Sequence, residues 1–412
     1  RSYVIGGHGE SEHFFPVEQF PQRLTPNTCE TCNTYNLLKL TRHLFIWQPD
    51  AARMDFVERA MINHLAANIG RAPGEFGYFL GLGSVGVKVF STPYDSWWCC
   101  VGTGLENPAR YGEMIYAVSN DTLWVNLFIG STFDWGEKGV FITQDTVFPD
   151  EETTRLRIRS TTPVRFILKL RHPHWCANPE LPLNGQTLAT ASQASSYISI
   201  EREWTGGDVL ELRLPMAPRL EALPHSDGTI QALVFGPTVL AAIIPEEPGI
   251  TNPSKLRFSE HLEARGKTDA FPPFFVTENR DAILAGLKPT DHFAEFRANG
   301  IMKPADLTFV PLHRVYEEAY AVYLPHLSPG EWIEKGHTLR VEREELLRLE
   351  NGTLDVVTPG YQQPEVEHAL AGEHTAIEDF ADRKCRIASD GGWFSYQMKT
   401  DPEETMVLQI TY

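Results

Sequence analysis

The pattern of apolar residues changes near Val118, and this change limits the folds that the chain can adopt. Before it, apolar residues recur with helical spacing; after it, short alternating and β-branched runs are separated by turn residues. Helices gathered ahead of strands, with little alternation between them, predict separate helical and β domains. We therefore expect a multidomain α + β chain.

Three helices are predicted in the first part, over 33–47, over a segment that Asp50 caps, and over 105–118. Pro49 ends the first of them, and a glycine-rich loop over 70–86 precedes a pair of cysteines and the third. Three or four such helices cannot close a core alone. We expect the chain to be a piece of a longer protein whose earlier sequence supplies their partners.

The later strands are short, at 122–128, 139–144, 155–159, 164–170, 196–201 and 209–214. Asn184-Gly185 is a two-residue hairpin signal among them. The pattern predicts a β-sandwich over 119–220 after a helical domain over 1–118. A second β-rich domain is expected over 221–345, with a proline-rich, irregular middle at 245–308 and a short helix over 344–348. A linker and the start of a further β domain are expected over 346–412.

Charge and hydropathy exclude some partners. The net charge of −18 argues against a nucleic-acid surface, which requires clustered Lys and Arg. No run of about 18 apolar residues is present to span a membrane. A neutral carbohydrate partner is compatible with this charge. A cytoplasmic, periplasmic or secreted location is equally compatible, and the sequence does not indicate an oligomeric state.

Four of the six cysteines fall in two short motifs, CETC at 29–32 and the tandem pair Cys99-Cys100. Glu30 and Cys32 are two residues apart, so in an extended segment their side chains point to the same side. With the tandem pair they offer three sulfurs and one carboxylate, a full tetrahedral shell for Zn²⁺. The predicted metal ligands are therefore Glu30, Cys32, Cys99 and Cys100.

Other interpretations of these cysteines stay open. Cys29 could replace Glu30 in a four-cysteine site, or form a redox pair with Cys32, or the two motifs could be buried thiols that never meet. The isolated Cys176 and Cys385 are expected to be buried small hydrophobes.

The runs ETCNTYNLLKLT and YDSWWCCVGTGLENPARYGE resemble the DUF1680 superfamily, which includes the zinc-thiolate β-L-arabinofuranosidases of glycoside hydrolase families 127 and 146. The EHF run at 12–14 within GGHGESEHFFP fits family 146 better. The resemblance is specific over residues 3–118 and weaker afterwards, at VFGPTVLAA and GGWFSYQM. It implies that the helices are the closing part of an (α/α)6 barrel whose N-terminal part is missing, followed by β-sandwich domains.

The resemblance also implies roles for individual residues. Glu12 matches the general acid/base, Glu30, Cys32 and Cys100 match zinc ligands, and Cys99 matches the ligand that is also the nucleophile. The implied reaction is retaining hydrolysis of β-L-arabinofuranosyl or similar residues from plant-type glycans. From the residues alone, Glu10 and Glu18 compete with Glu12.

Further residues are candidates for contact with a sugar: His8, His13, Tyr94 and Trp97, together with Trp98. For Glu106 and Arg110 a buried ion pair is expected, and His172 and His174 are weighed as a second metal site. A different class of function also stays open. The chain could be a non-catalytic carbohydrate-binding or scaffold piece with a structural zinc.

Overall fold

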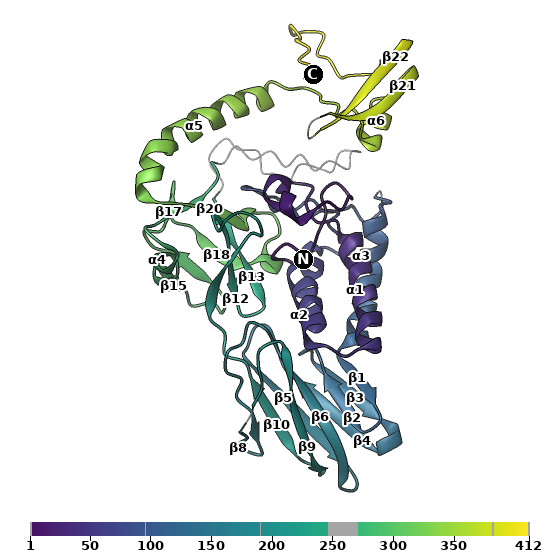
Figure 1. Cartoon of the computed structure of the whole chain (residues 1–412), viewed down its shortest axis with the longest axis vertical. Coiled ribbons are helices and arrows are strands. Elements are labelled where there is room, and N and C mark those ends of the chain that lie inside the picture. The colour runs from purple at the N-terminus through teal and green to yellow at the C-terminus, as the bar shows by residue number, and fades with distance from the viewer. Residues whose placement is uncertain (1, 95, 190, 246–270, 381–382, 411–412) are drawn as a thin grey trace. The chain divides into compact units, whose positions relative to one another are not determined.

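The computed structural model describes residues 2–94, 96–189, 191–245, 271–380 and 383–410 (Figure 1). They form two units, one of the described residues up to Trp332 and one of those from Ile333 onward. Within the described ranges no helix is long and apolar enough to cross a membrane. Several sheets and helices are present, which confirms the expected multidomain α + β class.

The N-terminal part of the first unit is helical. Its elements are a 3-10 helix Val17–Arg23, α1 Thr31–Trp47, α2 Ala51–Ala60, a π-helical turn Met61–Leu65, a 3-10 turn Ala66–Asn68, α3 Cys99–Arg110 and a 3-10 turn Tyr111–Met114. The helix predicted over 33–47 is confirmed as α1. Asp50 caps α2 as expected, because its side chain accepts a hydrogen bond from the Ala52 N–H at 2.9 Å. The (α/α)6 barrel stays a prediction.

The predicted bounds of the third helix are wrong. Helix α3 begins at Cys99, six residues before the expected start at 105, and ends at Arg110. The residues 116–118, expected to be helical, belong to strand β1, Tyr116–Ser119, which pairs with β2. Gly102 and Gly104 conceal the first turns of α3 in the sequence, since glycine is a poor helix former. Gly104 is needed there, because α3 passes close to the ring of Phe76.

Replacing Gly104 with alanine is expected to destabilise the protein by about 1–3 kcal/mol, the usual cost of overpacking. A Cβ at this position would lie 2.3 Å from Cδ1 of Phe76. Gly102→Ala in the same helix is the matched control, because its Cβ would meet no atom within 4 Å. Denaturant unfolding should show a loss for Gly104→Ala and no loss for Gly102→Ala. Equal effects would refute the steric explanation.

A β-sandwich follows the helices. One sheet has the order β1-β2-β6-β9 and the other β3-β4-β5-β10-β7-β8. The strands are β1 Tyr116–Ser119, β2 Thr122–Val125, β3 Ser131–Trp135, β4 Val140–Asp145, β5 Thr153–Ser160, β6 Val164–His172, β7 Pro182–Leu183, β8 Gln186–Thr187, β9 Ser196–Trp204 and β10 Val209–Arg213. Both sheets contribute to one apolar core that includes Trp204, Phe166 and Ile158. The predicted hairpin is confirmed, with Asn184 and Gly185 at positive φ between β7 and β8.

The rest of the first unit is a mainly antiparallel ten-stranded sheet. Its strands are β11 Pro218–Ala222, β12 Ile230–Phe235, β13 Thr238–Ile244, β14 Phe274–Val276, β15 Leu287–Pro289, β16 Phe296–Ala298, β17 Met302–Lys303, β18 Thr308–Pro311, β19 Ala319–Ala321 and β20 Tyr323–Leu327, with α4 Arg280–Ala285 and a 3-10 turn Leu312–Arg314. The region 245–308, predicted to be irregular, therefore contains regular elements from Phe274 onward. Its part at 246–270 lies outside the described residues.

Helix α5, Pro329–Asn351, begins in the first unit and continues into the second; only a short helix over 344–348 was expected. The second unit also contains α6 Gln362–Glu367 and a hairpin of β21 Ala371–Phe380 and β22 Arg383–Ser395. Glu365 is buried there and accepts hydrogen bonds from Arg386 at 2.5 and 2.6 Å and from the Tyr396 hydroxyl at 2.8 Å. The domain bounds expected at 118, 220 and 345 stay predictions.

Candidate metal and catalytic site

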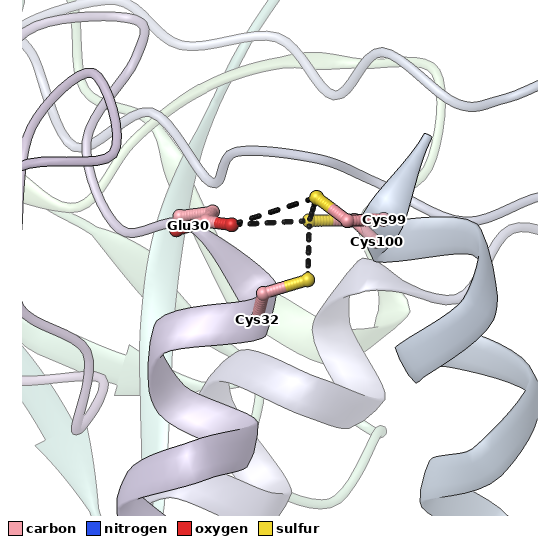
Figure 2. Close-up of side chains that lie close together, drawn as sticks. All are labelled: Glu30, Cys32, Cys99 and Cys100. Carbon is pink, nitrogen blue, oxygen red and sulfur yellow. Dashed lines mark hydrogen bonds between the residues drawn. The ribbon is translucent and has the colours of Figure 1, made fainter. Parts of the chain in front are cut away.

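The N-terminal ends of α1 and α3 bring the predicted ligands together. Glu30 is the residue before α1, Cys32 lies in its first turn, and Cys99 and Cys100 begin α3 (Figure 2). Each candidate ligand atom lies within 4.8 Å of the other three. The Cys32 and Cys100 sulfurs are 3.3 Å apart, those of Cys99 and Cys100 3.9 Å apart, and Oε1 of Glu30 is 3.8 Å from both Cys99 and Cys100. The predicted group is confirmed as a cluster that could hold a metal ion.

The sequence argument for Glu30 and Cys32 was wrong in its geometry. Glu30 has extended backbone, but the helix starts at Thr31, so the two residues do not share an extended segment. Convergence at two helix starts has an electrostatic consequence instead. The partial positive charge of a helix N-terminus favours anionic groups, and both helices present this end to the cluster.

Burial and mutual repulsion limit how many of these groups can ionise without a cation. Burial, with the nearby charge of Cys99, raises the pKa of Glu30 to about 7. Hydrogen bonds with Cys100 and Cys32 lower the pKa of Cys99, whereas hydrogen bonds with Cys32 and Cys99 raise the pKa of Cys100. Ionisation of one sulfur therefore opposes ionisation of its neighbours. A divalent cation would offset part of the negative charge and allow more of the four ligands to ionise together.

Without metal, the protein is expected to lose stability as the pH rises from about 4.5 to about 7. The carboxyl of Glu30 has a pKa of about 7 in the fold against an ordinary value of 4.5, so the folded state binds this proton more tightly. Stability linked to a raised pKa is complete below the lower value and is lost as pH passes through the higher one. Denaturant unfolding in chelator across this range should show the loss. It should be weaker in Glu30→Gln, and an equal loss in that variant would contradict this assignment.

Tyr78 connects the cluster to Glu12. Its hydroxyl donates a short hydrogen bond to Oε1 of Glu12 and lies 3.3 Å from Sγ of Cys99. The side chain is buried, and burial raises its pKa, so the hydroxyl keeps its proton. The backbone of Tyr78 is fixed against the start of α1, because the Thr31 N–H donates to the Tyr78 carbonyl at 2.9 Å. A sulfur and a carboxylate therefore share one hydroxyl.

The loop that presents Glu12 is conformationally strained. Ser11 and Glu12 both have positive φ, 45° and 69°, a region that side chains other than glycine seldom adopt. Such strain costs about 1–3 kcal/mol per residue and is concentrated at functional sites. The competing Glu10 is engaged elsewhere, since it accepts from Ser11 Oγ at 2.8 Å and pairs with Arg23 at 3.6 Å. The geometry favours Glu12 over Glu10.

Cys29 is not part of the cluster. Its thiol is fully buried, and its Sγ would lie 2.8 Å from a Cβ built on Gly7. Burial raises its pKa well above the usual range. The four-cysteine alternative is therefore not supported, and Cys29 packs in the core as a small hydrophobe. Cys176 is buried as expected, whereas Cys385 is only half-buried.

The predicted sugar-contact residues differ in their exposure to solvent and in their contacts. Nε2 of His8 is 3.1 Å from the Phe15 carbonyl and its ring packs against three phenylalanines, while the exposed His13 bonds to the Ser11 carbonyl at 2.6 Å. Tyr94 and Trp97 are 84% and 89% exposed. Their roles stay predictions. Of the aromatic residues in this loop, Trp98 packs against Tyr78 at 5.9 Å between ring centroids.

Two other expectations are compared with the structure. His172 and His174 were expected to be solvated loop residues rather than a second metal site, but His172 is buried at the end of β6, between Ser192 and the Cys176 carbonyl, while His174 contacts Arg59. Among the described residues the group at Glu30 is the sole candidate metal cluster, so the second metal site is not supported. Glu106 and Arg110 do form an ion pair at 2.6 Å, but it is partly exposed on the surface of α3.

Sequence reasoning missed Tyr78 and Thr103. Tyr78 lies in the segment expected to be a turn-rich loop; its only sequence signal is the aromatic run FGYF among the glycines. Thr103 has no signal at all, because its hydroxyl reaches Cys32, 71 residues away in the chain.

Three segments of the chain match known protein families. Residues 1–113 match the family model of the GH127 β-L-arabinofuranosidase catalytic domain, residues 122–216 match that of the GH127 middle domain, and residues 348–412 match DUF6805, a family of unknown function. No curated protein matches the chain.

Three solved structures are similar in fold. A GH127 β-L-arabinofuranosidase from Geobacillus stearothermophilus T6 has 20% identity and a TM-score of 0.58, over 79% of this chain and 55% of that one. A glycoside hydrolase has 19% identity and a TM-score of 0.58, over 79% and 59%. A GH127 β-arabinofuranosidase has 22% identity and a TM-score of 0.60, over 80% and 55%. The chain thus spans little more than half the length of these proteins.

Proposed function

We propose that this chain, which carries segments matching the catalytic and middle domains of GH127 enzymes, is the catalytic-site part of a retaining glycoside hydrolase that removes β-L-arabinofuranosyl or similar residues from plant-type glycans. One observation carries the proposal. The Tyr78 hydroxyl contacts both Cys99 Sγ and Glu12 Oε1. Two groups that both contact one hydroxyl lie about 5 Å apart or less. Retaining glycosidases place nucleophile and acid about 5–5.5 Å apart.

The cluster fits zinc. A tetrahedral zinc ion with Zn–S bonds of about 2.3 Å requires sulfur atoms about 3.8 Å apart. The two sulfur pairs of Cys100 lie at 3.3 and 3.9 Å, so small adjustments would complete the shell. Three sulfurs and one carboxylate also belong to the soft ligand range that selects zinc over magnesium or calcium. Glu30, Cys32, Cys99 and Cys100 would hold the ion.

The four ligands have different access to solvent, and this difference assigns the nucleophile. Cys100 and Glu30 are buried and Cys32 is half-buried, whereas Cys99 is exposed and its sulfur contacts the Tyr78 hydroxyl. When bound, zinc would keep the sulfurs deprotonated. Cys99 is then the sulfur that a sugar can reach.

The reaction divides between Cys99 and Glu12. In the first step Cys99 Sγ forms a bond to the anomeric carbon while the bond to the leaving oxygen breaks, and Glu12 gives its proton to that oxygen. In the second step Glu12 takes a proton from water, whose oxygen bonds to the anomeric carbon as the carbon–sulfur bond breaks. Two displacements retain the anomeric configuration. Tyr78 holds both groups in register.

The test is hydrolysis of a chromogenic β-L-arabinofuranoside by this chain and by its full-length parent, with zinc content measured on the same samples. NMR of the first-formed sugar should show the β-anomer. An α-anomer as the first product would overturn the retaining mechanism, and zinc-free protein of undiminished activity would overturn the metal assignment.

A second candidate function is a non-catalytic carbohydrate-binding or scaffold piece with a structural zinc. This chain covers only 55–59% of the lengths of the matched structures, so parts of the substrate site that they contain can be missing from it. It predicts bound zinc and no turnover by either the chain or its parent. Turnover by the parent alone would instead assign the missing sugar contacts to sequence outside this chain.

A further inference from the structure

Thr103 lies one turn after Cys100 on α3 and faces the start of α1. Its Oγ1 is 3.3 Å from Sγ of Cys32 and 3.2 Å from the backbone carbonyl oxygen of Cys100. The side chain is half-buried, so water does not fully replace these contacts. A single hydroxyl therefore links the sulfur of Cys32 on α1 to the backbone of Cys100 on α3.

A hydroxyl has only one hydrogen to give. When Cys32 is a thiol, its S–H can donate to Oγ1 while the hydroxyl donates to the Cys100 carbonyl. When Cys32 is a thiolate, the sulfur can only accept, and rotation about the Cβ–Oγ bond turns the hydrogen toward it. The contact therefore changes its donor when the cluster gains a metal, because metal ligation needs the deprotonated sulfur.

We propose that Thr103 is a positioning residue for the metal ligand Cys32, donating a hydrogen bond to its thiolate in the metal-bound cluster. This inference rests on the metal site of the proposed function. The bond fixes the direction of the sulfur and withdraws part of its charge from the metal. Hydrogen bonds of this kind to metal ligands typically change metal affinity by about 10–100-fold when removed.

The experiment compares Thr103→Val with Thr103→Ser in the full chain, with zinc and with cobalt(II) as probes. Valine keeps the shape of threonine but loses the hydroxyl; serine keeps the hydroxyl. Thr41→Val is the matched control, because Thr41 Oγ1 donates only within its own helix, to the Leu37 carbonyl at 2.7 Å. Zinc affinity is measured by chelator competition, and cobalt–thiolate bonding by the near-ultraviolet charge-transfer band.

We expect Thr103→Val to bind zinc about 10-fold or more weakly and to shift the cobalt charge-transfer band to longer wavelength, because an unbonded thiolate gives up its electrons more easily. Thr103→Ser and Thr41→Val should match the unmodified chain in both zinc affinity and the position of the cobalt band. Unchanged affinity and band in Thr103→Val, with only a loss of thermal stability, would show a purely structural hydroxyl and overturn the inference.

The same measurements separate this inference from the proposed function. If the unmodified chain binds neither zinc nor cobalt, the metal site itself fails and the role of Thr103 falls with it. If metal binds and Thr103→Val behaves as expected, but neither the unmodified chain nor its full-length parent hydrolyses an arabinofuranoside, the inference stands and the enzymatic proposal fails.

Discussion

Cys99→Ala is expected to reduce hydrolysis of an arabinofuranoside by about 10⁴-fold or more, as loss of a covalent nucleophile does in other hydrolases. The geometry behind this expectation is the exposed sulfur at the start of α3, 3.3 Å from the Tyr78 hydroxyl. The measurement is kcat/KM on samples whose zinc content is known, because Cys99 is also a predicted ligand.

Two comparisons give this result its meaning. The same loss of activity should be seen in Cys99→Ala preparations that still carry zinc on the remaining three ligands. Cys385→Ser, on β22 in the second unit, should keep full activity, since its thiol bonds to the Glu378 carbonyl of the paired strand β21 and is not part of the cluster. If the zinc-loaded Cys99→Ala variant had nearly the activity of the unsubstituted protein, Cys99 would not be the nucleophile.

Glu12→Gln is expected to reduce hydrolysis by about 10²–10⁴-fold, the usual contribution of general acid–base catalysis. The loss should depend on the leaving group. With a nitrophenolate leaving group the first step needs little protonation, so only the second step is slowed and a burst of nitrophenol should precede slow turnover. With an alkyl or glycan leaving group both steps should slow.

Glu18→Gln is the control for this variant, because Glu18 is an exposed carboxylate in the same part of the chain. It should show neither the burst nor the loss. If Glu10→Gln reproduced the leaving-group dependence and Glu12→Gln did not, the acid/base assignment would move to Glu10, despite its ion pair with Arg23.

The sequence predicts the ligand types and the helical start of the chain well, because these rest on local signals. The cap at Asp50 and the hairpin at Asn184-Gly185 are such signals, and both are confirmed. The metal ligands could be named because soft ligands in two short motifs are chemically uncommon.

The parts that failed depend on distant contacts. The start of α3 was misplaced because Gly104 is a poor helix former in isolation but the only residue that fits beside Phe76. Tyr78 was not found because its function comes from Glu12 and Cys99, which reach it through the fold. The choice of Glu30 over Cys29 also required coordinates, since adjacent residues at a helix start can face opposite directions.

The central claim is that the sulfur of Cys99 bonds to the sugar during turnover. Mass spectrometry of the Glu12→Gln variant tests it directly, after a rapid acid quench during reaction with a nitrophenyl β-L-arabinofuranoside. Because the second step is slowed, a pentosyl group should accumulate on the protein, and peptide fragmentation should place it on Cys99. A pentosyl group on a carboxylate side chain, or quenched protein without any adduct despite the burst, would contradict the account.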